Sequence, residues 1–550
     1  MMRVSTRGIR WFEAMADTDY IIVGSGSAGS VLANRLTTSG RHRVTLLEAG
    51  GSDRRFYVQM PLGYGKLFYD PKVNWCYQTE PDPGLAGNRD FWPRGKMLGG
   101  SSSINAMVYI RGHRADYDEW GVNPGWGWDD CLAAYKAMED TEAGGDYWRG
   151  VGGPLFVSQN SRGLHPLVQD YIAACGQAGL PYNRDFNGAV QEGAGTYQMT
   201  IRKARRNSAA RAFLRPAMGR ANLRVITGAM VTRVVMEGSR AVGVEYLRGG
   251  ERVVLRCTAE VILAAGAIGS PQLLQLSGIG PGSLLQGLGI GLVRDNPNVG
   301  DHLNDHQGIN YTWRMNVPTY NDILRPWWGK ALVGAQYLLT GGGPLAKSIN
   351  HAGGFFRTRP GLDRPNMQLY FQAFSTLMPR NGERPLLTPD PFSGLSIGLS
   401  NCRPTSRGHI MLRSADAREH PVITANAFST EHDVTEMLEA VKFLRVIAAQ
   451  PAFAPLVAEE LRPGPAVVSD ADLIADFRMR SGTVYHPSCT ARMGADAAGS
   501  VVDAGLRVHG VQGLRVCDAS AFPNLIAGNT NAPAMMMGWK GADLVLADAR

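Results

Sequence analysis

Hydrophobic positions near the N-terminal end of the chain follow the pattern of a strand, a glycine-rich turn, a helix and a second strand. The apolar segment Asp19 to Val23 leads into the turn Gly24 to Gly29, and a helical pattern continues to about Leu36. A second strand then runs from Arg43 to Leu47 and ends at Glu48. This order predicts a βαβ unit, the opening of a dinucleotide-binding domain.

The glycines of the turn have the G-x-G-x-x-G spacing of dinucleotide-binding proteins. Gly24 allows the tight turn, Gly26 lets the backbone approach a pyrophosphate, and Gly29 allows close packing of helix on strand. Glu48, 19 residues after Gly29, is positioned to accept hydrogen bonds from ribose hydroxyls. These residues alone do not decide whether the bound dinucleotide is NAD or FAD.

The rest of the hydrophobic pattern predicts a mixed segment, from about residue 307 to residue 481, with dinucleotide-domain character on both sides of it. The expected strands are Arg224–Thr227, Thr232–Met236, Ala241–Leu247, Val253–Ala265, Asn366–Gln372, His409–Leu412 and Leu514–Cys517, and the expected helices are Asp433–Ile447 and Ala532–Ala547.

Composition narrows the class of protein. A chain of 550 residues that is 44% hydrophobic can bury the cores of two domains. The net charge of +8 is spread without a Lys/Arg-rich block, so nucleic-acid binding is not expected. The seven cysteines include no C-x-x-C pair, and no apolar run reaches the length of a membrane span. We expect a cytoplasmic protein, either free or peripheral to the membrane.

The first residues have a different character. Met1 to Ala14 contains three arginines and no long apolar run, which argues against a secretory signal. Translation starts either at Met1 or at Met15. We expect residues 1–17 to form a disordered extension.

A second glycine-rich loop runs from Arg94 to Asn105. Small residues in that number let a backbone press against a large planar ligand, although Gly99 and Gly100 are equally compatible with an ordinary turn.

Four motifs in this chain resemble those of the glucose–methanol–choline (GMC) oxidoreductase family, and the resemblance covers nearly the whole chain from Asp19 onward. The motifs are Gly24–Gly29, Arg94–Asn105, Gly266–Gly280 and Tyr485–Asp543. Within the family, the sequence most resembles bacterial choline-dehydrogenase-like and sorbose-dehydrogenase-like proteins. The resemblance implies FAD rather than NAD, and oxidation of a primary or secondary alcohol.

The implied fold is α/β, or α+β overall, with a Rossmann-like FAD-binding domain and a discontinuous substrate domain built on an antiparallel sheet. We assign residues 18–160, 200–306 and 510–550 to the FAD-binding domain with its flavin lid. Residues 161–199 and 307–509 are assigned to the substrate-binding domain.

The resemblance also implies cofactor contacts. Glu48 would bind the adenosine ribose, Val231 would offer its backbone to the adenine, and Asp518 with Ala519 would lie beside the pyrophosphate and ribityl chain. The full set of cofactor-binding candidates is Gly24, Gly26, Ser27, Ala28, Gly29, Glu48, Gly99, Gly100, Ser103, Asn105, Val231, Asp518, Ala519 and Asn531.

Gly100 and Asn105 would flank the isoalloxazine ring. Some family members tether the flavin through a histidine just before this asparagine, but here that residue is Ile104, so we expect noncovalent FAD. Asn298 and His302 depart from the residues usual in relatives, which leaves the local turn geometry open.

His486 aligns with the family's catalytic histidine, and Asn529 stands where relatives carry histidine or asparagine. Removing hydride from an alcohol carbon requires the hydroxyl proton to leave, and histidine accepts protons near neutral pH. Asparagine can donate a hydrogen bond to the alkoxide oxygen, and the Asn529 segment can also cap the helix that follows it. Val484 and Tyr485 are expected at the substrate pocket. His302 and His306 are expected to be structural, and no metal site is indicated.

Two alternatives stay open at this point. One is a non-redox family member, such as a lyase or a light-driven decarboxylase, and the other is a noncatalytic FAD-binding protein. The alcohol and the electron acceptor (oxygen, a quinone or a redox protein) are not identified by the sequence. Either an apolar substrate pocket or core packing would accommodate the side chains of Trp327, Trp328, Phe371, Phe374 and Met378.

Overall fold

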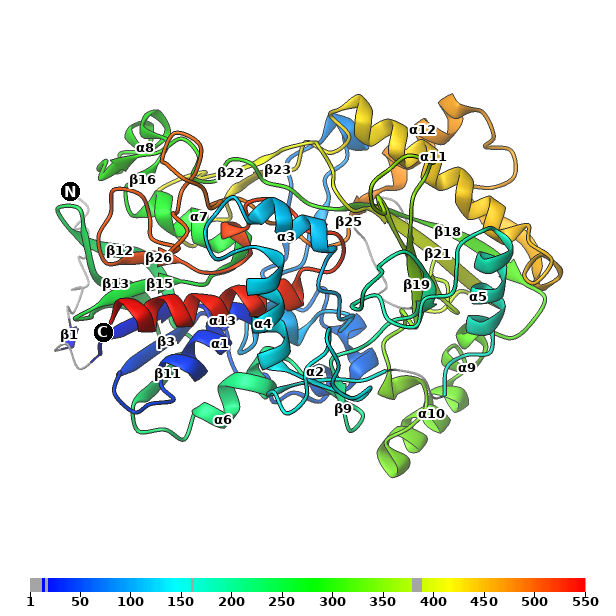
Figure 1. Cartoon of the computed structure of the whole chain (residues 1–550), viewed down its shortest axis with the longest axis horizontal. Helices are drawn as coiled ribbons and strands as arrows, with labels where there is room; N and C mark the ends of the chain where they lie inside the picture. Colours follow the sequence, from blue (N-terminus) through cyan, green and yellow to red (C-terminus); the bar gives the residue numbers. More distant parts are fainter. Residues whose placement is uncertain (1–11, 15–17, 160–162, 378–387, 550) are drawn as a thin grey trace, which may run out of the picture.

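A parallel sheet and an antiparallel sheet occupy opposite halves of the molecule (Figure 1). The computed structural model describes residues 12–14, 18–159, 163–377 and 388–549. The last helix of the described residues lies on the side of the parallel sheet, in the left half of Figure 1. The two halves therefore have separate frameworks, and each has its own buried core.

The parallel sheet forms the framework of the first half. Its helices are α1 (Ser27–Leu36) and α13 (Asn531–Asp548), which pack against each other (Figure 1). Two of its strands, Tyr20–Val23 and Val44–Glu48, are buried along their whole length, as near-continuous apolar runs predict for parallel strands. In order across the sheet, they are β11 (Leu223–Thr227), β3 (Val44–Glu48), β2 (Tyr20–Val23), β15 (Glu260–Leu263) and β26 (Leu514–Val516).

An adjoining antiparallel meander consists of β12 (Met230–Glu237), β13 (Arg240–Arg248) and β14 (Glu251–Arg256). The expected single strand Val253–Ala265 is wrong. The chain turns at residues 257–259, so β14 lies in the meander and β15 lies in the parallel sheet. An apolar run does not reveal which of two sheets each of its parts joins.

The N-terminal extension is partly ordered. Strand β1 (Phe12–Ala14) pairs in parallel with β14, so the expectation of disorder is wrong for these three residues. Residues 1–11 and 15–17, the rest of the expected extension, lie outside the described residues.

The antiparallel sheet forms the framework of the second half. Alternate residues of its strands face opposite sides, as strand geometry requires. On β18, Tyr311 and Trp313 are buried in the core, while Gly308, Asn310 and Thr312 line a cavity. The strand order is β24 (Val457–Arg462), β18 (Gln307–Met315), β21 (Gly394–Asn401), β20 (Met367–Gln372), β19 (Ala352–Phe356) and β8 (Gly193–Thr196), with β25 (Gly482–Thr483) paired to β18.

Helices cover the core face of this sheet. Helix α11 (Glu431–Ala448) packs on β21, and α5 (Leu167–Gln177) packs on α11 and β8. No helix in the described ranges is long and apolar enough to span a membrane. The other α-helices are α2 (Phe56–Gln59), α3 (Arg114–Trp120), α4 (Trp128–Met138), α6 (Arg215–Ala217), α7 (Gly266–Leu276), α8 (Gly282–Gly287), α9 (Tyr320–Leu324), α10 (Trp327–Thr340) and α12 (Asp470–Arg480).

Short strand pairs complete the fold. They are β4 (Tyr77–Gln78) with β5 (Phe91–Trp92), β6 (Glu139–Thr141) with β7 (Leu155–Val157), β9 (Ile201–Arg202) with β10 (Arg205–Arg206), β16 (Ile279–Gly280) with β17 (Arg294–Asp295), and β22 (His409–Met411) with β23 (Val422–Thr424).

Candidate active site

One cavity of about 1250 Å³ is lined by residues from both sheets. The ends of β2 and β3 and the turn after β2 line one part of it, and β18 and β20 line another. Ligands of open parallel sheets bind beyond the carboxyl ends of the strands, which is where this cavity begins. The cavity therefore joins the predicted dinucleotide site to the second sheet.

The glycine turn is tightly packed except where it faces the cavity. A Cβ on Gly29 would lie 1.9 Å from the carbonyl oxygen of Gly24, and Gly24 itself has a φ of +98°. A Cβ on Gly26 would meet only one atom, at 3.9 Å. The turn thus leaves room for a ligand at Gly26 and for no side chain at Gly29.

Two helix N-termini meet at this cavity. The Ser27 hydroxyl at the start of α1 donates a hydrogen bond of 2.8 Å to the side-chain oxygen of Asn531 at the start of α13. Both residues line the cavity. The positive dipole ends and free N–H groups of the two helices make this part of the cavity suited to a phosphate group.

The two acidic candidates of the cofactor site are buried and held by protein donors. The Glu48 carboxylate accepts hydrogen bonds from the backbone N–H groups of Ser25 (3.0 Å) and Gly50 (2.8 Å) and from the Ser25 hydroxyl. Asp518 accepts from the Gly266 N–H (2.8 Å) and other donors. Burial raises the pKa of both carboxyl groups. Through these hydrogen bonds, the two carboxyl groups hold in place the loops that form the cavity wall.

The structure places most of the predicted cofactor residues in the cavity wall. Gly29, Gly99 and Ser103 are not among the lining residues, and the Ser103 hydroxyl instead donates to the Leu98 carbonyl. The predicted residues that line the cavity are Gly24, Gly26, Ser27, Ala28, Glu48, Gly100, Asn105, Val231, Val484, Tyr485, His486, Asp518, Ala519, Asn529 and Asn531.

A dinucleotide fits this wall. Besides the open space at Gly26 and the two helix N-termini, the cavity wall includes buried polar atoms without a hydrogen-bond partner among the described residues, the Nε of Arg94 and the hydroxyl of Ser481. Buried polar atoms without a hydrogen-bond partner are rare in protein interiors, and they are expected where a polar ligand binds.

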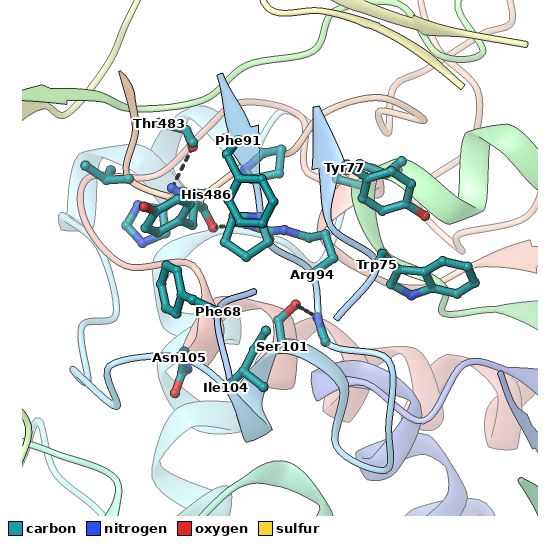
Figure 2. A pocket seen from close by; sticks show the side chains of 18 of the residues that line it. Phe68, Trp75, Tyr77, Phe91, Arg94, Ser101, Ile104, Asn105, Thr483 and His486 are labelled. Carbon is teal, nitrogen blue, oxygen red and sulfur yellow. Dashed lines mark hydrogen bonds between the residues drawn. The ribbon is translucent and has the colours of Figure 1, made fainter. Parts of the chain in front are cut away.

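His486 and Asn529 meet in the cavity although they are 43 residues apart in sequence. His486 follows β25, and Asn529 lies two residues before α13. The side-chain nitrogen Nδ2 of Asn529 is 3.1 Å from Nε2 of His486. Figure 2 shows His486, Phe68 and Asn105 on the left side of the pocket view, and Trp75 and Tyr77 on the right side.

The hydrogen bonds of a second histidine determine which nitrogen of His486 carries the proton. Nε2 of His306 is 3.0 Å from the carbonyl oxygen of Cys402, which can only accept, so this nitrogen carries hydrogen. In neutral His306, Nδ1 is then an acceptor, and it lies 2.9 Å from Nδ1 of His486. His486 therefore donates from Nδ1, and its Nε2 is left as the acceptor that faces Asn529.

Both histidines are neutral at neutral pH. Burial lowers the pKa of His306 to about 4. Burial, and then the charges of His306 and Arg94, lower the pKa of His486 well below its usual value. The orientation of Asn529 is also fixed, because its Oδ1 accepts a hydrogen bond of 3.1 Å from Gln368.

The contact of His306 with His486 is a feature that the sequence prediction missed. His306 was expected to be only structural, and its position at the edge of β18 next to β25 depends on strand pairing between distant segments. His302, by contrast, is 3.4 Å from the side-chain oxygen of Asn298 and is not among the lining residues.

Of the predicted apolar pocket residues, Phe371 and Phe374 are fully buried in the core. Trp327 and Trp328 are 80% and 56% exposed on α10, so the expectation that they line a pocket or pack in the core is wrong. Met378 lies outside the described residues.

Comparisons with known proteins find similarity over most of the chain. Two family models described as GMC oxidoreductase match residues 18–308 and 404–538. The mitochondrial choline dehydrogenase of Mus musculus is 42% identical over 96% of this chain and 89% of its own length. An alcohol dehydrogenase (acceptor) of Pseudomonas putida is 42% identical over 96% of this chain and 95% of its own length.

Solved structures are similar over the same extent. The crystal structure of pyridoxine 4-oxidase from Mesorbium loti has a TM-score of 0.87 and 30% identity, covering 96% of this chain and 99% of that one. A formate oxidase structure has a TM-score of 0.89 and 26% identity, covering 96% and 98%.

Proposed function

Because this chain belongs to the GMC oxidoreductase family and is an FAD-dependent enzyme that oxidises alcohols, we propose that His486 is the base that accepts the hydroxyl proton of the substrate. The observation that carries the proposal is the hydrogen-bond geometry of His486, which leaves Nε2 as the acceptor in the cavity wall, 3.1 Å from Nδ2 of Asn529. A proton acceptor with a lowered pKa is in its basic form at neutral pH.

Asn529 is the partner in this step. Its amide N–H points at Nε2 of His486, so a substrate hydroxyl that enters between the two side chains would give its proton to His486 and receive a hydrogen bond from Asn529. Donation to the oxygen stabilises the charge that develops there. Gln368 holds the amide in the orientation that keeps the N–H on the side of the histidine.

FAD, when bound, accepts the hydride that leaves the substrate carbon. We assign its phosphates to the N-termini of α1 and α13 and its adenosine ribose to Glu48. Retention is noncovalent, since the side chain at the position of tethering in some relatives is that of Ile104, which has no nucleophilic group. Denaturation with acid should then release intact FAD, whereas flavin that stays with the precipitated chain would contradict this assignment.

The substrate is proposed to be an uncharged alcohol with further hydrogen-bonding groups. The second sheet presents neutral polar side chains to the cavity, among them Thr312, Tyr370 and Gln372. The nearby carboxylate of Asp476 is already bound by both oxygens to Arg480. Asp90 is half-buried and accepts hydrogen bonds from the backbone N–H of Thr483 and the indole N–H of Trp92, and loss of hydration raises its pKa to about 6.

Choline is the second candidate, because the mouse relative is a choline dehydrogenase. A choline cation would find the charge of Asp476 already balanced by Arg480, which leaves Asp90 as the carboxylate that could balance it at this sheet. The test is anaerobic mixing of the FAD-loaded protein with polyols, aliphatic alcohols, aromatic alcohols and choline, with flavin absorbance as the readout. Fastest bleaching by choline would contradict the proposed substrate class.

The same screen tests the proposed reaction. Bleaching by an alcohol in the wild type and its loss in His486→Ala are expected. If the substrate were consumed without any change in flavin absorbance, the non-redox alternative would replace alcohol oxidation as the activity of this chain.

A further inference from the structure

Helix α10 exposes an apolar face to solvent. Leu339, Trp327 and Leu338 are 85%, 80% and 70% exposed, and Trp328 and Leu332 are each 56% exposed. Large apolar side chains that are exposed together on one element are unusual in a monomeric soluble protein. We therefore expect this exposed face of α10 to contact a partner.

The exposed side chains occupy one continuous side of the helix. With about 100° between successive residues, these five side chains and those of Ala331 and Ala335 fall within a sector of about 140°. Gly329 and Val333 lie on the opposite side and are buried against the protein. The helix is thus amphipathic in the reverse sense, with small or buried residues inward and its largest apolar residues outward.

A basic hairpin adjoins α10. Strands β9 and β10 are joined at residues 203 and 204, and the Tyr337 hydroxyl on α10 donates a hydrogen bond of 3.1 Å to the Ala204 carbonyl. Arg202, Lys203 and Arg205 of this hairpin are exposed. Apolar and basic groups are therefore presented side by side.

The positive charge at this hairpin is not balanced locally. Burial, and then the charges of Arg205, Arg215 and Arg202, lower the pKa of Arg211. Among the described residues, no salt bridge joins Arg202, Lys203 or Arg205 to a carboxylate, whereas Arg215 is paired with Asp53. The local potential therefore favours an anionic partner.

Helix α2 extends the apolar part of the surface. Phe56 and Tyr57 are 56% and 47% exposed, and the Phe56 ring lies 6.4 Å from the ring of Tyr337. Figure 1 shows α2, β9 and α10 along the lower edge of the molecule. The surface thus spans three elements on one side of the protein.

We propose that α10, with the adjoining β9–β10 hairpin and α2, attaches this protein to an anionic lipid membrane. The 14 residues of α10 are too few to cross a bilayer, which takes about 20, but they suit a helix that lies in the interface. Exposed tryptophans favour that depth, and basic side chains beside the helix attract anionic headgroups.

The charge distribution favours a membrane over a second copy of this chain. A symmetric dimer through α10 would place the hairpins of the two copies near each other, and their like charges would repel. The chain also runs from α10 through η5 (Pro344–Ala346) to Ile349 and Asn350, which line the cavity. The proposed membrane surface is therefore connected by a short segment to the wall of the active site, although the inference does not depend on the catalytic roles.

Vesicle sedimentation tests the proposal with the FAD-loaded full chain. Vesicles of phosphatidylcholine with about 30% phosphatidylglycerol should bind the wild type at low salt, and added salt should weaken the binding. The triple variant Trp327→Gln/Leu338→Gln/Leu339→Gln should lose at least about tenfold in partitioning. Its alcohol-driven flavin reduction in solution should match the wild type, because these side chains are exposed and lie outside the cavity wall.

The variant Arg202→Gln/Lys203→Gln/Arg205→Gln separates charge from apolar contact. Each removed charge should weaken binding to the anionic vesicles by about fivefold, and most of the salt dependence should disappear. Matched controls are Val122→Gln/Val468→Gln, which alters exposed apolar residues elsewhere, and Arg240→Gln/Arg248→Gln, which alters exposed arginines of β13. Both controls should bind as the wild type does.

Three outcomes would overturn the proposal. In the first, the wild type remains in the supernatant with the anionic vesicles at low salt, and in the second, the α10 variant binds as well as the wild type. The third is a dimer, measured by light scattering, that the α10 variant converts to a monomer while vesicles do not compete with it. That result would make this face an interface between copies of the chain.

Discussion

The two walls of the cavity are built on different physical principles. The wall at the parallel sheet depends on backbone conformation within one short segment, Gly24–Gly29, with Glu48 close by in sequence. The wall at the antiparallel sheet depends on side-chain hydrogen bonds between distant residues, such as His306 and His486, which are 180 residues apart. Substitutions at the first wall should therefore act by steric clash, which prevents cofactor binding. Substitutions at the second wall should act by removing the hydrogen bonds that orient the catalytic side chains.

The largest effect is expected at the first wall. In Gly29→Ala, the new Cβ would lie 1.9 Å from the Gly24 carbonyl oxygen, so the turn must move. We expect nearly complete loss of bound FAD and a lower melting temperature, measured by flavin absorbance and thermal unfolding.

The matched control for this change is Gly51→Ala, since a Cβ on Gly51 meets no atom within 4 Å. It should retain FAD and stability. Full FAD occupancy in Gly29→Ala would show that the turn adapts to the new side chain. That result would contradict the claim that cofactor binding at the first wall depends on steric fit.

The same contrast explains what the sequence could predict. The turn Gly24–Gly29 and strand β3 were found because strand, glycines, helix and acid follow one another within about 30 residues, which is a local pattern. The structure bears out β2, α1 and α13 with bounds that differ by up to three residues, since α1 already begins at Ser27 within the expected turn. The parallel and antiparallel sheets of the expected fold class are both present.

Features that depend on distant partners were missed. The role of His306 as a hydrogen-bond partner requires the pairing of β18 with β25, and no local pattern encodes that register. The assignment of Val253–Ala265 to one strand failed for a related reason, since its two parts join different sheets. The exposure of Trp327 and Trp328 was missed because an apolar helical pattern is usually evidence of burial.

At the second wall, His486→Ala should have the largest effect on chemistry. We expect FAD to be retained and anaerobic flavin reduction to slow by about 10²-fold or more, the usual cost of losing an acid–base group. Asn529→Ala should slow reduction by a smaller factor. The double variant should fall short of the product of the two, because both side chains act on one hydroxyl group. Wild-type reduction rates in His486→Ala across the pH range would mean that the pair is structural.

A smaller effect is expected at His306, which positions His486 without lining the cavity. In His306→Leu, the Nδ1–H of His486 loses its acceptor, so the protonated nitrogen is no longer fixed. We expect flavin reduction to slow by about tenfold at constant FAD content. His306→Gln, whose side chain can both donate and accept, should recover part of the rate.

The acid side of the pH profile distinguishes positioning from packing in these variants. Removing His306 also removes one of the groups that lower the pKa of His486, so the acid limb of the reduction rate should move to higher pH in His306→Leu. An unchanged limb together with a slower rate would indicate that His306 serves packing alone.

The smallest effect is expected at Asp305, whose carboxylate accepts a hydrogen bond of 2.8 Å from the backbone N–H of His486. Burial raises its pKa to about 7. As the pH rises through 7, Asp305 becomes negatively charged, and a negative charge near His486 makes proton acceptance more favourable. The wild-type reduction rate should therefore rise by about two- to threefold between pH 6 and pH 8. The main loss from protonation of His486 lies below pH 6.5, because the pKa of His486 is well below that value. Asp305→Asn should abolish the step near pH 7 and leave the lower limb in place. A step that persists near pH 7 in Asp305→Asn would have to come from another group, and the antiparallel-sheet wall would then contain a titrating partner of His486 other than Asp305.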